Sequence, residues 1–238
     1  MGNKDSLAVV MPVYNEEGAI AAVLDKWLSM LDRLDDVEYQ IHVYNDGSKD
    51  KTKEILDQYE KGKENKLIVH NKPNSGHGAT ILLGYQENSR NHDWIFQIDS
   101  DDEMGPELFP DLWERRRDYD FLLGIREGRK QVLPRKIISF VSRQVVRIFY
   151  GKRTVWDVNS PYRLMRSKVF YKIYQEIPRD TFAPNVIISG MVAKCGLRYY
   201  QQMIPQRDRQ TGEVSIKKWK LFKAAVKSFW QTITFAFR

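Results

Sequence analysis

The stretch LAVVMPVYNEEGAI, residues 7–20, decides the fold class. Residues 7–13 form a short, β-rich apolar run, the polar loop YNEEG follows it, and an amphipathic pattern then extends over about residues 19–34. This order predicts a buried strand, a loop and a helix. It is the first of several such units along the chain.

The same unit recurs through the first half of the sequence. Further strands are predicted at residues 39–45, 66–71 and 94–99, and helices end near residue 59 and span about 79–87. Alternating strands and helices predict right-handed β-α-β connections and a mostly parallel sheet covered on both faces. Ligands of such sheets bind at the carboxyl ends of the strands. The polar residues found there are Asn15, Glu16, Asp46, Gly76 to Gly78 and Asp99 to Asp102.

The second half has a looser pattern. It predicts a strand at residues 121–126, helices at 136–150 and 169–177, and a helix followed by a strand within 186–203. Residues 216–237 predict a basic amphipathic helix, which either packs on the core or binds a membrane surface. Its apolar positions recur every three or four residues, with lysines to one side: Trp219, Phe222, Val226, Phe229, Trp230, Ile233 and Phe237, beside Lys217, Lys220, Lys223 and Lys227.

Composition and charge limit the class of protein. The chain has 238 residues, 42% of them apolar, which is typical of a globular protein with one large domain or two small ones. The single cysteine, Cys195, cannot form an internal disulfide, and we expect neither a signal peptide nor a spanning helix. We therefore expect a cytoplasmic protein.

The net charge of +7 is unevenly distributed. Residues 126–153 contain nine Lys or Arg against one acid, whereas residues 99–107 contain five acids and no base. This asymmetry suggests an anionic ligand such as a phosphate, a nucleic acid or a lipid surface.

The segment QIDSDDE, residues 97–103, is the strongest candidate site. In an extended chain alternate side chains share a face, so Asp99 and Asp101 point the same way. Two carboxylates suit Mg²⁺ or Mn²⁺, which complete their shells with water and substrate phosphates. The alternative is a surface acidic turn ahead of Pro106, and Asp102 is expected to be a turn or cap residue.

Two other segments carry weaker signals. In PNSGHGAT, glycines bring backbone amides to a helix N-terminus, where an anion binds favourably, although a plain turn explains the residues equally well. The arginines of residues 135–147 are mostly expected on a solvated face. Arg126 and Arg135 are set apart from these solvated arginines, because each directly follows a loop at the sheet edge.

Taken together, these motifs resemble the inverting family 2 glycosyltransferases with the GT-A fold. The resemblance covers VVMPVYNEEGAI, VYNDGSKDKT, NSGHGAT followed by Gly84, QIDSDDEMGPE, GIR and DVNSPYRLMR, in this order. The second half is similar to polyprenyl-phosphate glycosyltransferases of the dolichol-phosphate mannose synthase type. The parallels there are a "DPTSGFR"-like segment at residues 157–163 and an Arg-x-x-Gly-x-Ser-Lys-like segment at residues 209–217.

The resemblance implies an α/β fold, with a single Rossmann-like GT-A domain over residues 1–212 and an amphipathic C-terminal helix over residues 213–238. It implies roles for individual residues as follows: Pro12, Tyr14, Glu16 and Asp46 hold the nucleoside; Asp99, Ser100 and Asp101 meet the sugar, ribose and metal-bound diphosphate; Glu103 is a further metal ligand; Arg126, Arg135 and Ser139 bind an acceptor phosphate; and Arg209, Ser215 and Lys217 close over the diphosphate. Catalysis then rests on Asp101, Arg126 and Asp157.

Three departures from the family pattern concern the acceptor. Tyr162 follows Pro161 where the family has Gly-Phe, the Ser215 loop has one extra residue, and no membrane-spanning segments follow. The first two put the acceptor pocket in question. The third leaves the terminal helix as the visible route to a lipid.

Acceptor chemistry provides an independent argument. A sugar hydroxyl must lose a proton as it attacks and so requires a base, whereas a phosphate is already an anion. Residues 182–206, where hydroxyl-using relatives place a Glu-Asp base, contain no acid. This favours a phosphate acceptor, with Asp157 as the base in the alternative case.

The sequence therefore predicts a metal-dependent hexosyltransferase that moves a sugar from a UDP- or GDP-sugar to polyprenyl phosphate in cell-envelope synthesis. We expect it on the cytoplasmic face of the membrane as a peripheral protein, with a separate membrane protein as a further candidate partner and without nucleic acid. One alternative is a family 2 enzyme that extends a lipid-linked or surface glycan at a hydroxyl. The other is a non-catalytic basic protein that binds membranes or nucleic acid.

Overall fold

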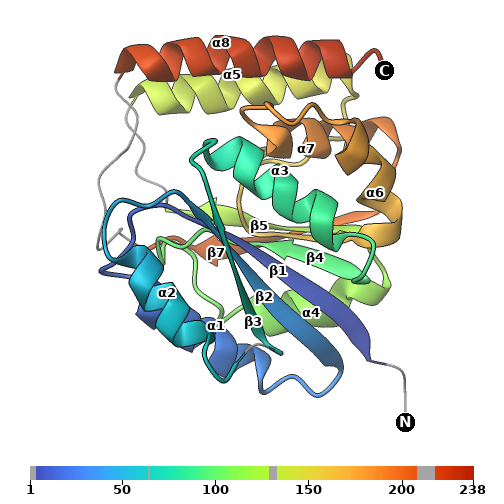
Figure 1. The fold of residues 1–238 in the computed structure, drawn as a ribbon. Coiled ribbons are helices and arrows are strands. Elements are labelled where there is room, and N and C mark those ends of the chain that lie inside the picture. The colour runs from blue at the N-terminus through green and yellow to red at the C-terminus, as the bar shows by residue number, and fades with distance from the viewer. Residues whose placement is uncertain (1–3, 64, 129–132, 208–217) are drawn as a thin grey trace.

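The computed structural model describes residues 4–63, 65–128, 133–207 and 218–238. Within these residues, seven strands form one sheet in the order β3-β2-β1-β4-β6-β5-β7 (Figure 1). The strands are β1 (Asp5–Val13), β2 (Val37–Asp46), β3 (Leu67–Lys72), β4 (Trp94–Gln97), β5 (Phe121–Glu127), β6 (Arg163–Arg166) and β7 (Tyr199–Pro205). All paired neighbours are parallel except β6, which is antiparallel to both β4 and β5. The predicted mostly parallel α/β sheet is confirmed.

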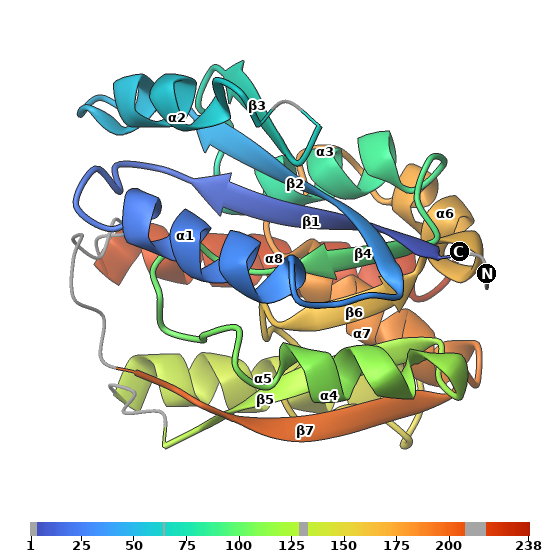
Figure 2. The ribbon, with the colours of Figure 1, turned by 90° about the horizontal axis from the view of Figure 1, so that it is seen from below.

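The central strand β1 explains why the sheet is covered on both faces. Leu7, Val9 and Met11 enter one hydrophobic core, and the alternate residues Ala8 and Val10 enter the other. The first core is closed by α1 (Ile20–Leu31), α2 (Thr52–Glu60) and α4 (Phe109–Glu114), the last of which continues into the 3₁₀ turn η1 (Arg115–Arg117). The second is closed by α3 (His77–Asn88), α6 (Ser167–Glu176) and α7 (Pro184–Lys194). Figure 2 shows these two helical layers on opposite sides of the strands.

Two long helices form an additional outer layer. α5 (Leu133–Phe149) and α8 (Lys218–Phe235) lie side by side above α7 (Figure 1). The hydroxyl of Tyr150, just after α5, donates to the carbonyl of Thr232 in α8 at 2.6 Å. No helix among the described residues has the length and apolarity needed to cross a bilayer.

The sequence-based element bounds need a few corrections. The strand predicted at 94–99 ends at Gln97, and the helix predicted from residue 136 begins at Leu133. Both β6 and α4 lack a prediction, because β6 is a four-residue strand bounded by two arginines and α4 is a six-residue helix. The predicted domain boundary at 212/213 lies outside the described residues.

Candidate active site

The loops that follow β1 and β2 are joined by hydrogen bonds at the carboxyl edge of the sheet. Asn15, in the left-handed region at φ 54°, donates its backbone amide to Ser48 Oγ at 3.0 Å and accepts from the Lys49 amide at 2.8 Å. The amide of buried Glu16 donates to Thr52 Oγ1 at 2.9 Å. These bonds hold the YNEEG loop against the start of α2.

Asp46 ends β2 and organises the loop that leads into α3. Its carboxylate is buried and forms an ion pair with Lys72. It accepts hydrogen bonds from the backbone amides of Ser75 at 2.8 Å and Gly76 at 2.9 Å. Gly76 has φ +88°, a conformation that glycine adopts without the steric cost that a Cβ imposes. The NSGHG loop therefore takes its shape from one buried carboxylate.

Asp99 follows β4 and is positioned by a buried polar chain. Its Oδ1 accepts from the Gln97 side-chain amide at 3.0 Å and lies 3.0 Å from His77 Nε2. Gln97 Oε1 in turn accepts from the Tyr85 hydroxyl and the Asn185 amide, each at 2.8 Å. Burial raises the pKa of Asp99, but the His77 ring, the Arg126 charge and the Gln97 hydrogen bond together hold that pKa below its usual value. Asp99 therefore presents an ionised and oriented carboxylate at the carboxyl edge of the sheet.

The rest of the acidic segment separates into different environments. Asp101 Oδ1 accepts from the Glu103 amide at 3.2 Å, and Ser100 is buried. Asp102 has φ 55° and pairs with Lys26, as expected of a turn residue. The Glu103 carboxylate accepts from the Gln206 side chain. In the part of the chain that the structure describes, no three His, Cys, Asp or Glu side chains form a group that could hold a metal ion.

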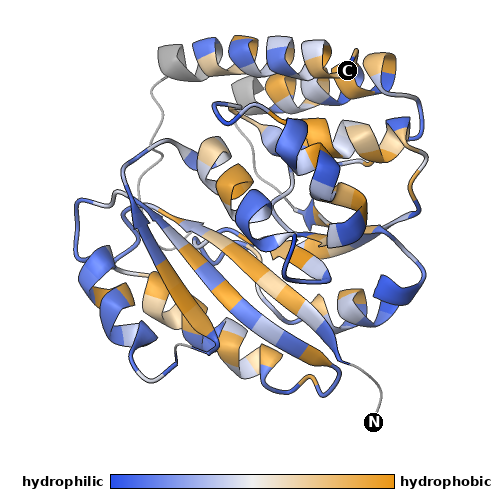
Figure 3. Cartoon of the chain, turned by 45° about the vertical axis from the view of Figure 1, so that its right-hand side comes forward, coloured by the Kyte–Doolittle hydropathy of each residue, from blue (hydrophilic) through white to orange (hydrophobic). Residues whose placement is uncertain are grey.

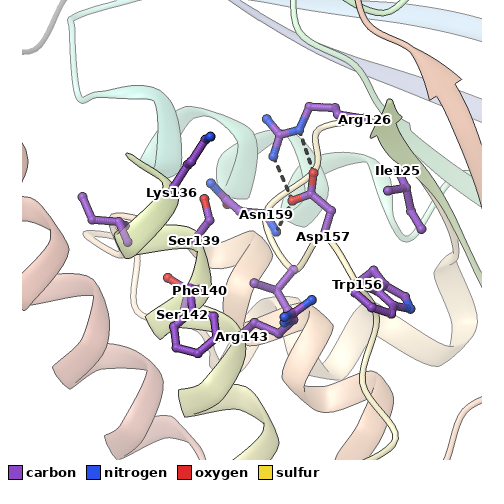
Figure 4. Close-up of a pocket in the computed structure, with 12 residues that line it drawn as sticks. Ile125, Arg126, Lys136, Ser139, Phe140, Ser142, Arg143, Trp156, Asp157 and Asn159 are labelled. Carbon is purple, nitrogen blue, oxygen red and sulfur yellow. Dashed lines mark hydrogen bonds and ion pairs between the residues drawn. The ribbon is translucent and has the colours of Figure 1, made fainter. Parts of the chain in front are cut away.

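A pocket of about 350 Å³ lies between β5, α5 and the loop at residues 156–159 (Figure 4). Arg126 and Asp157 form a two-pronged ion pair in it, with Nε to Oδ2 at 2.7 Å and Nη2 to Oδ1 at 2.8 Å. On the opposite side the Arg143 guanidinium lies 4.8 Å from the centre of the Trp156 ring. The lining residues are Ile125, Arg126, Lys136, Ile138, Ser139, Phe140, Ser142, Arg143, Trp156, Asp157, Val158 and Asn159. Three cations against one acid make this pocket suitable for an anion.

Arg163, which is fully buried in β6, holds the pocket loop in place. It donates to the Ser160 carbonyl from Nε at 2.8 Å and Nη2 at 2.7 Å, and to the Asn185 carbonyl from Nη1 at 3.0 Å. Ser160 Oγ also donates to the Gly124 carbonyl at 2.6 Å. Burial lowers the pKa of Arg163 to about 10, which leaves the side chain charged at neutral pH.

The model of glycosyl transferase family 2 matches residues 8–174, more than half of the chain. The chain belongs to this glycosyltransferase family.

Relatives with curated descriptions include both characterised and uncharacterised proteins. An undecaprenyl-phosphate 4-deoxy-4-formamido-L-arabinose transferase of Photorhabdus laumondii is 31% identical over 180 residues, covering 75% of this chain and 54% of the relative. An uncharacterised protein of Methanocaldococcus jannaschii is 28% identical over 224 residues, covering 89% of this chain and 93% of the relative. The glycosyltransferase thus spans about half the length of the arabinose transferases it matches.

Solved structures share the fold. The glucosyl-3-phosphoglycerate synthase of Mycobacterium tuberculosis, in complex with Mn²⁺, UDP and phosphoglyceric acid, has a TM-score of 0.69 at 15% identity, covering 98% of this chain and 78% of that one. S. aureus TarS with UDP-GlcNAc has a TM-score of 0.59 at 20% identity, covering 89% and 61%. The seven-stranded sheet is therefore a GT-A fold.

The predicted site residues of this family 2 glycosyltransferase fall into two groups. Pro12, Tyr14, Glu16, Asp46, Asp99, Ser100, Asp101 and Glu103 lie in or after β1, β2 and β4, whereas Arg126, Ser139 and Asp157 line the pocket. The side chain of Arg135 and all of Arg209, Ser215 and Lys217 lie outside the described residues.

Sequence reasoning missed four residues that shape the site: His77, Gln97, Arg143 and Arg163. Gln97 and Arg163 interrupt apolar strand segments and are fully buried, a pattern that signals an internal polar network. Arg143 was grouped with solvated arginines, but it lines the pocket because it lies one helical turn beyond Ser139. His77 lies inside the GHG loop, and nothing local marks it as a partner of Asp99.

Proposed function

We propose that this protein is an inverting glycosyltransferase that moves a sugar from a nucleotide sugar to polyprenyl phosphate at the cytoplasmic face of a membrane. The observation that carries the proposal is the cation-lined pocket beside the strand ends, whose one acidic residue is paired with Arg126. The arabinose transferases among the relatives, named for undecaprenyl phosphate, support this acceptor class.

The donor binds at the carboxyl edge of β1, β2 and β4. Pro12, Tyr14, Glu16 and Asp46 hold the nucleoside, and Ser100 lies beside the diphosphate. Arg209, Ser215 and Lys217, which are outside the described residues, close over that diphosphate. UDP- and GDP-sugars are the donor candidates.

The donor set of this edge suits a divalent cation. Asp99 and Asp101 supply hard carboxylate oxygens two residues apart, and Asp99 is kept ionised by its neighbours. Mg²⁺ or Mn²⁺ held by these two residues would neutralise charge on the departing nucleoside diphosphate. Glu103, the third candidate ligand, accepts from Gln206 in this structure and does not form a three-residue group with them, so substrate phosphate and water would complete the shell. The Mn²⁺ complex of the structurally similar synthase supports this assignment.

The acceptor phosphate binds in the pocket with Arg126, Arg135 and Ser139. A phosphate oxygen attacks the anomeric carbon, a new C–O bond forms, and the bond to the nucleoside diphosphate breaks with inversion. No proton has to be removed, so the Arg126–Asp157 pair acts as a rigid phosphate clamp, not as a base. The segment around the start of α7 supports this reading, because residues 182–206 contain no Asp or Glu that could act as the base.

A direct acceptor competition tests the proposal. The purified protein is given labelled UDP- and GDP-sugars with Mn²⁺, and polyprenyl phosphate and a glycan acceptor are supplied in parallel. We expect label in the lipid extract, in alkali-stable and mild-acid-labile form, and none without the metal. Label in the glycan alone would overturn the phosphate acceptor. Absence of label in both, together with binding to any polyanion, would support a non-catalytic protein.

A further inference from the structure

Exposed apolar side chains are concentrated on one part of the molecule. Among the described residues ten large apolar side chains are exposed, and seven of them lie on α5, on α8 or directly after α8. The seven are Ile137, Phe140, Ile148, Phe149, Val226, Trp230 and Phe237, with exposures from 37% to 77%. We call these seven the outer apolar face. Soluble proteins rarely expose so many large apolar groups together unless the surface binds something.

α8 packs on the protein through its small and polar residues. The buried positions Ala225, Ser228 and Thr232 recur at helical spacing, followed by Phe235 and Ala236. Trp230 and Phe237 point away from this stripe and are 65% and 77% exposed. The interpretation of the terminal helix as ordinary core is therefore wrong for these residues, because the helix presents to solvent the apolar side chains that a core helix would bury.

α5 repeats this arrangement. Ser142 and Val146 are buried, whereas Ile137, Phe140 and Ile148 are 54%, 56% and 72% exposed. The rings of Phe149 and Phe237 lie 6.0 Å apart, so the exposed apolar residues of the two helices join at their C-terminal ends. Figure 3 shows apolar and polar segments alternating along both helices.

Hydrogen bonds and an ion pair between α8 and the rest of the protein fix the orientation in which Trp230 and Phe237 face solvent. Phe182 donates its backbone amide to Gln231 Oε1 at 3.0 Å, and Lys194 donates to the Ala236 carbonyl at 2.7 Å. Lys227 pairs with Asp180 at 2.7 Å. With the Tyr150 hydroxyl bond, these contacts fix the rotation of the helix and keep Trp230 outside.

The charges that α5 and α8 themselves carry have one sign. The sequences of α5 and α8 contain four Lys or Arg each and no Asp or Glu. Arg147 and Lys223 are exposed on them. Apolar side chains bordered by cations complement a bilayer with anionic headgroups, since the rings enter the interface while the cations meet phosphate.

We propose that α5 and α8 together dock on an anionic lipid bilayer, with the outer apolar face inserted at the headgroup boundary. Phe140 belongs both to this face and to the lining of the pocket, and the neighbouring Trp156 is 67% exposed. The pocket thus opens next to the docked surface. This inference goes beyond the proposed function, because it concerns the surface that binds lipid and holds whether or not the acceptor is polyprenyl phosphate.

Vesicle partition tests the docking surface. The full chain is mixed with phosphatidylcholine vesicles, with or without phosphatidylglycerol, and bound protein is measured by flotation. We expect binding to the anionic vesicles, weakened at least about tenfold by the double variant Ile148→Ser/Trp230→Ser. Met203→Ser is the matched control, since Met203 is 50% exposed on β7 and lies outside the face.

A charge reversal tests whether the cations of α5 and α8 contribute to binding of anionic headgroups. Arg147→Glu should weaken binding to anionic vesicles by roughly fivefold or more and leave binding to neutral vesicles unchanged. Lys61→Glu, on the surface at the end of α2, should change neither. Thermal midpoints confirm that each variant folds.

The docking proposal fails in either of two cases. One is equal vesicle binding by the parent and the double variant. The other is no vesicle binding by the parent, which would assign the face to a protein partner instead. Because the assay needs no substrate, its failure is distinguishable from failure of sugar transfer. Transfer to a water-soluble short-chain phosphate acceptor should be unchanged in the double variant.

Discussion

At the scale of single residues, neighbouring carboxylates of one segment have different partners. Asp99 is held by Gln97 and His77, Asp102 by Lys26 and Glu103 by Gln206. The acids of QIDSDDE thus have partners from three other parts of the chain, besides Gln97 in the segment itself. Sequence reasoning reached the turn role of Asp102, because a turn is a local feature. The alternation predicted for Asp99 and Asp101 assumed an extended chain, whereas β4 ends at Gln97, and the partners of the acids are set by the fold.

Removing one donor-site carboxylate should abolish transfer without unfolding the protein. We expect Asp101→Ala to lower kcat by about 100- to 1000-fold, since stabilisation of the leaving diphosphate is lost. The measurement is labelled sugar transfer over a range of Mn²⁺ concentrations. Asp102→Asn is the matched control, because it alters the adjacent carboxylate, which faces Lys26. Full activity of Asp101→Ala in the presence of a chelator would refute the metal role.

Substitution of Asp157 distinguishes two roles for this residue, the orientation of Arg126 and general-base catalysis. If it orients Arg126, Asp157→Asn should raise the KM for the acceptor by about tenfold, while kcat changes less, because one charge-assisted pair is lost. If it were a base, kcat would fall by about 100-fold or more and its pH profile would lose a limb. Steady-state kinetics against acceptor concentration at several pH values separates the two.

At the scale of elements, the first half of the chain follows its sequence pattern closely. Strands such as β1 are apolar on both faces and are followed by polar loops. The apolar run and the polar residues that end it are therefore enough to predict such strands from the sequence. β6 could not be predicted in this way, because it has only four residues and both its ends are arginines, Arg163 and Arg166. The carbonyls that accept hydrogen bonds from Arg163 are placed by the tertiary structure. For the pocket, the family resemblance named Arg126, Ser139 and Asp157, whereas the meeting of β5, α5 and a distant loop that brings them together comes from the tertiary structure.

The approach of α3 to α7 depends on a missing side chain. A Cβ at Gly78 would lie 2.0 Å from the Phe182 carbonyl oxygen, so Gly78→Ala should force the two helix starts apart and cost about 2 to 3 kcal/mol of unfolding free energy. Urea denaturation measures this. In Gly196→Ala the new methyl meets nothing within 4 Å and has only the cost of φ +60°, about 1 kcal/mol. Equal losses in both variants would contradict the packing argument.

At the scale of the whole molecule, a histidine cluster formed by His42 on β2, His70 on β3 and His92 just before β4 should make stability depend on pH. Burial lowers the pKa of His42 to about 3, and the nearby His92 and His70 rings add to the effect. His42 Nδ1 lies 3.1 Å from His70 Nε2. The folded protein therefore keeps this ring neutral under conditions in which the unfolded chain takes up a proton.

The sign of the effect follows from linkage. Stability contributed by neutral His42 is complete above about pH 6.5 and is lost as the pH falls toward 3, by up to about 1.4 kcal/mol per pH unit. Urea midpoints between pH 7 and pH 4 measure the slope, which His42→Gln should reduce. An unchanged slope in that variant would show that other groups control acid unfolding.

The antiparallel strand β6 has a consequence for how such enzymes diversify. Within the described residues it is the strand that pairs the proposed donor side of the sheet, β3-β2-β1-β4, to the proposed acceptor side, β5 and β7. The residues proposed to hold the nucleoside and the metal are encoded before residue 105, whereas the proposed acceptor residues and the diphosphate-closing Arg209, Ser215 and Lys217 follow residue 120, so one crossover near Asp118 exchanges each set as a unit. Recombination at that point would join the sugar preference of one parent to the acceptor preference of another, provided that the short β4–β6 seam keeps its register.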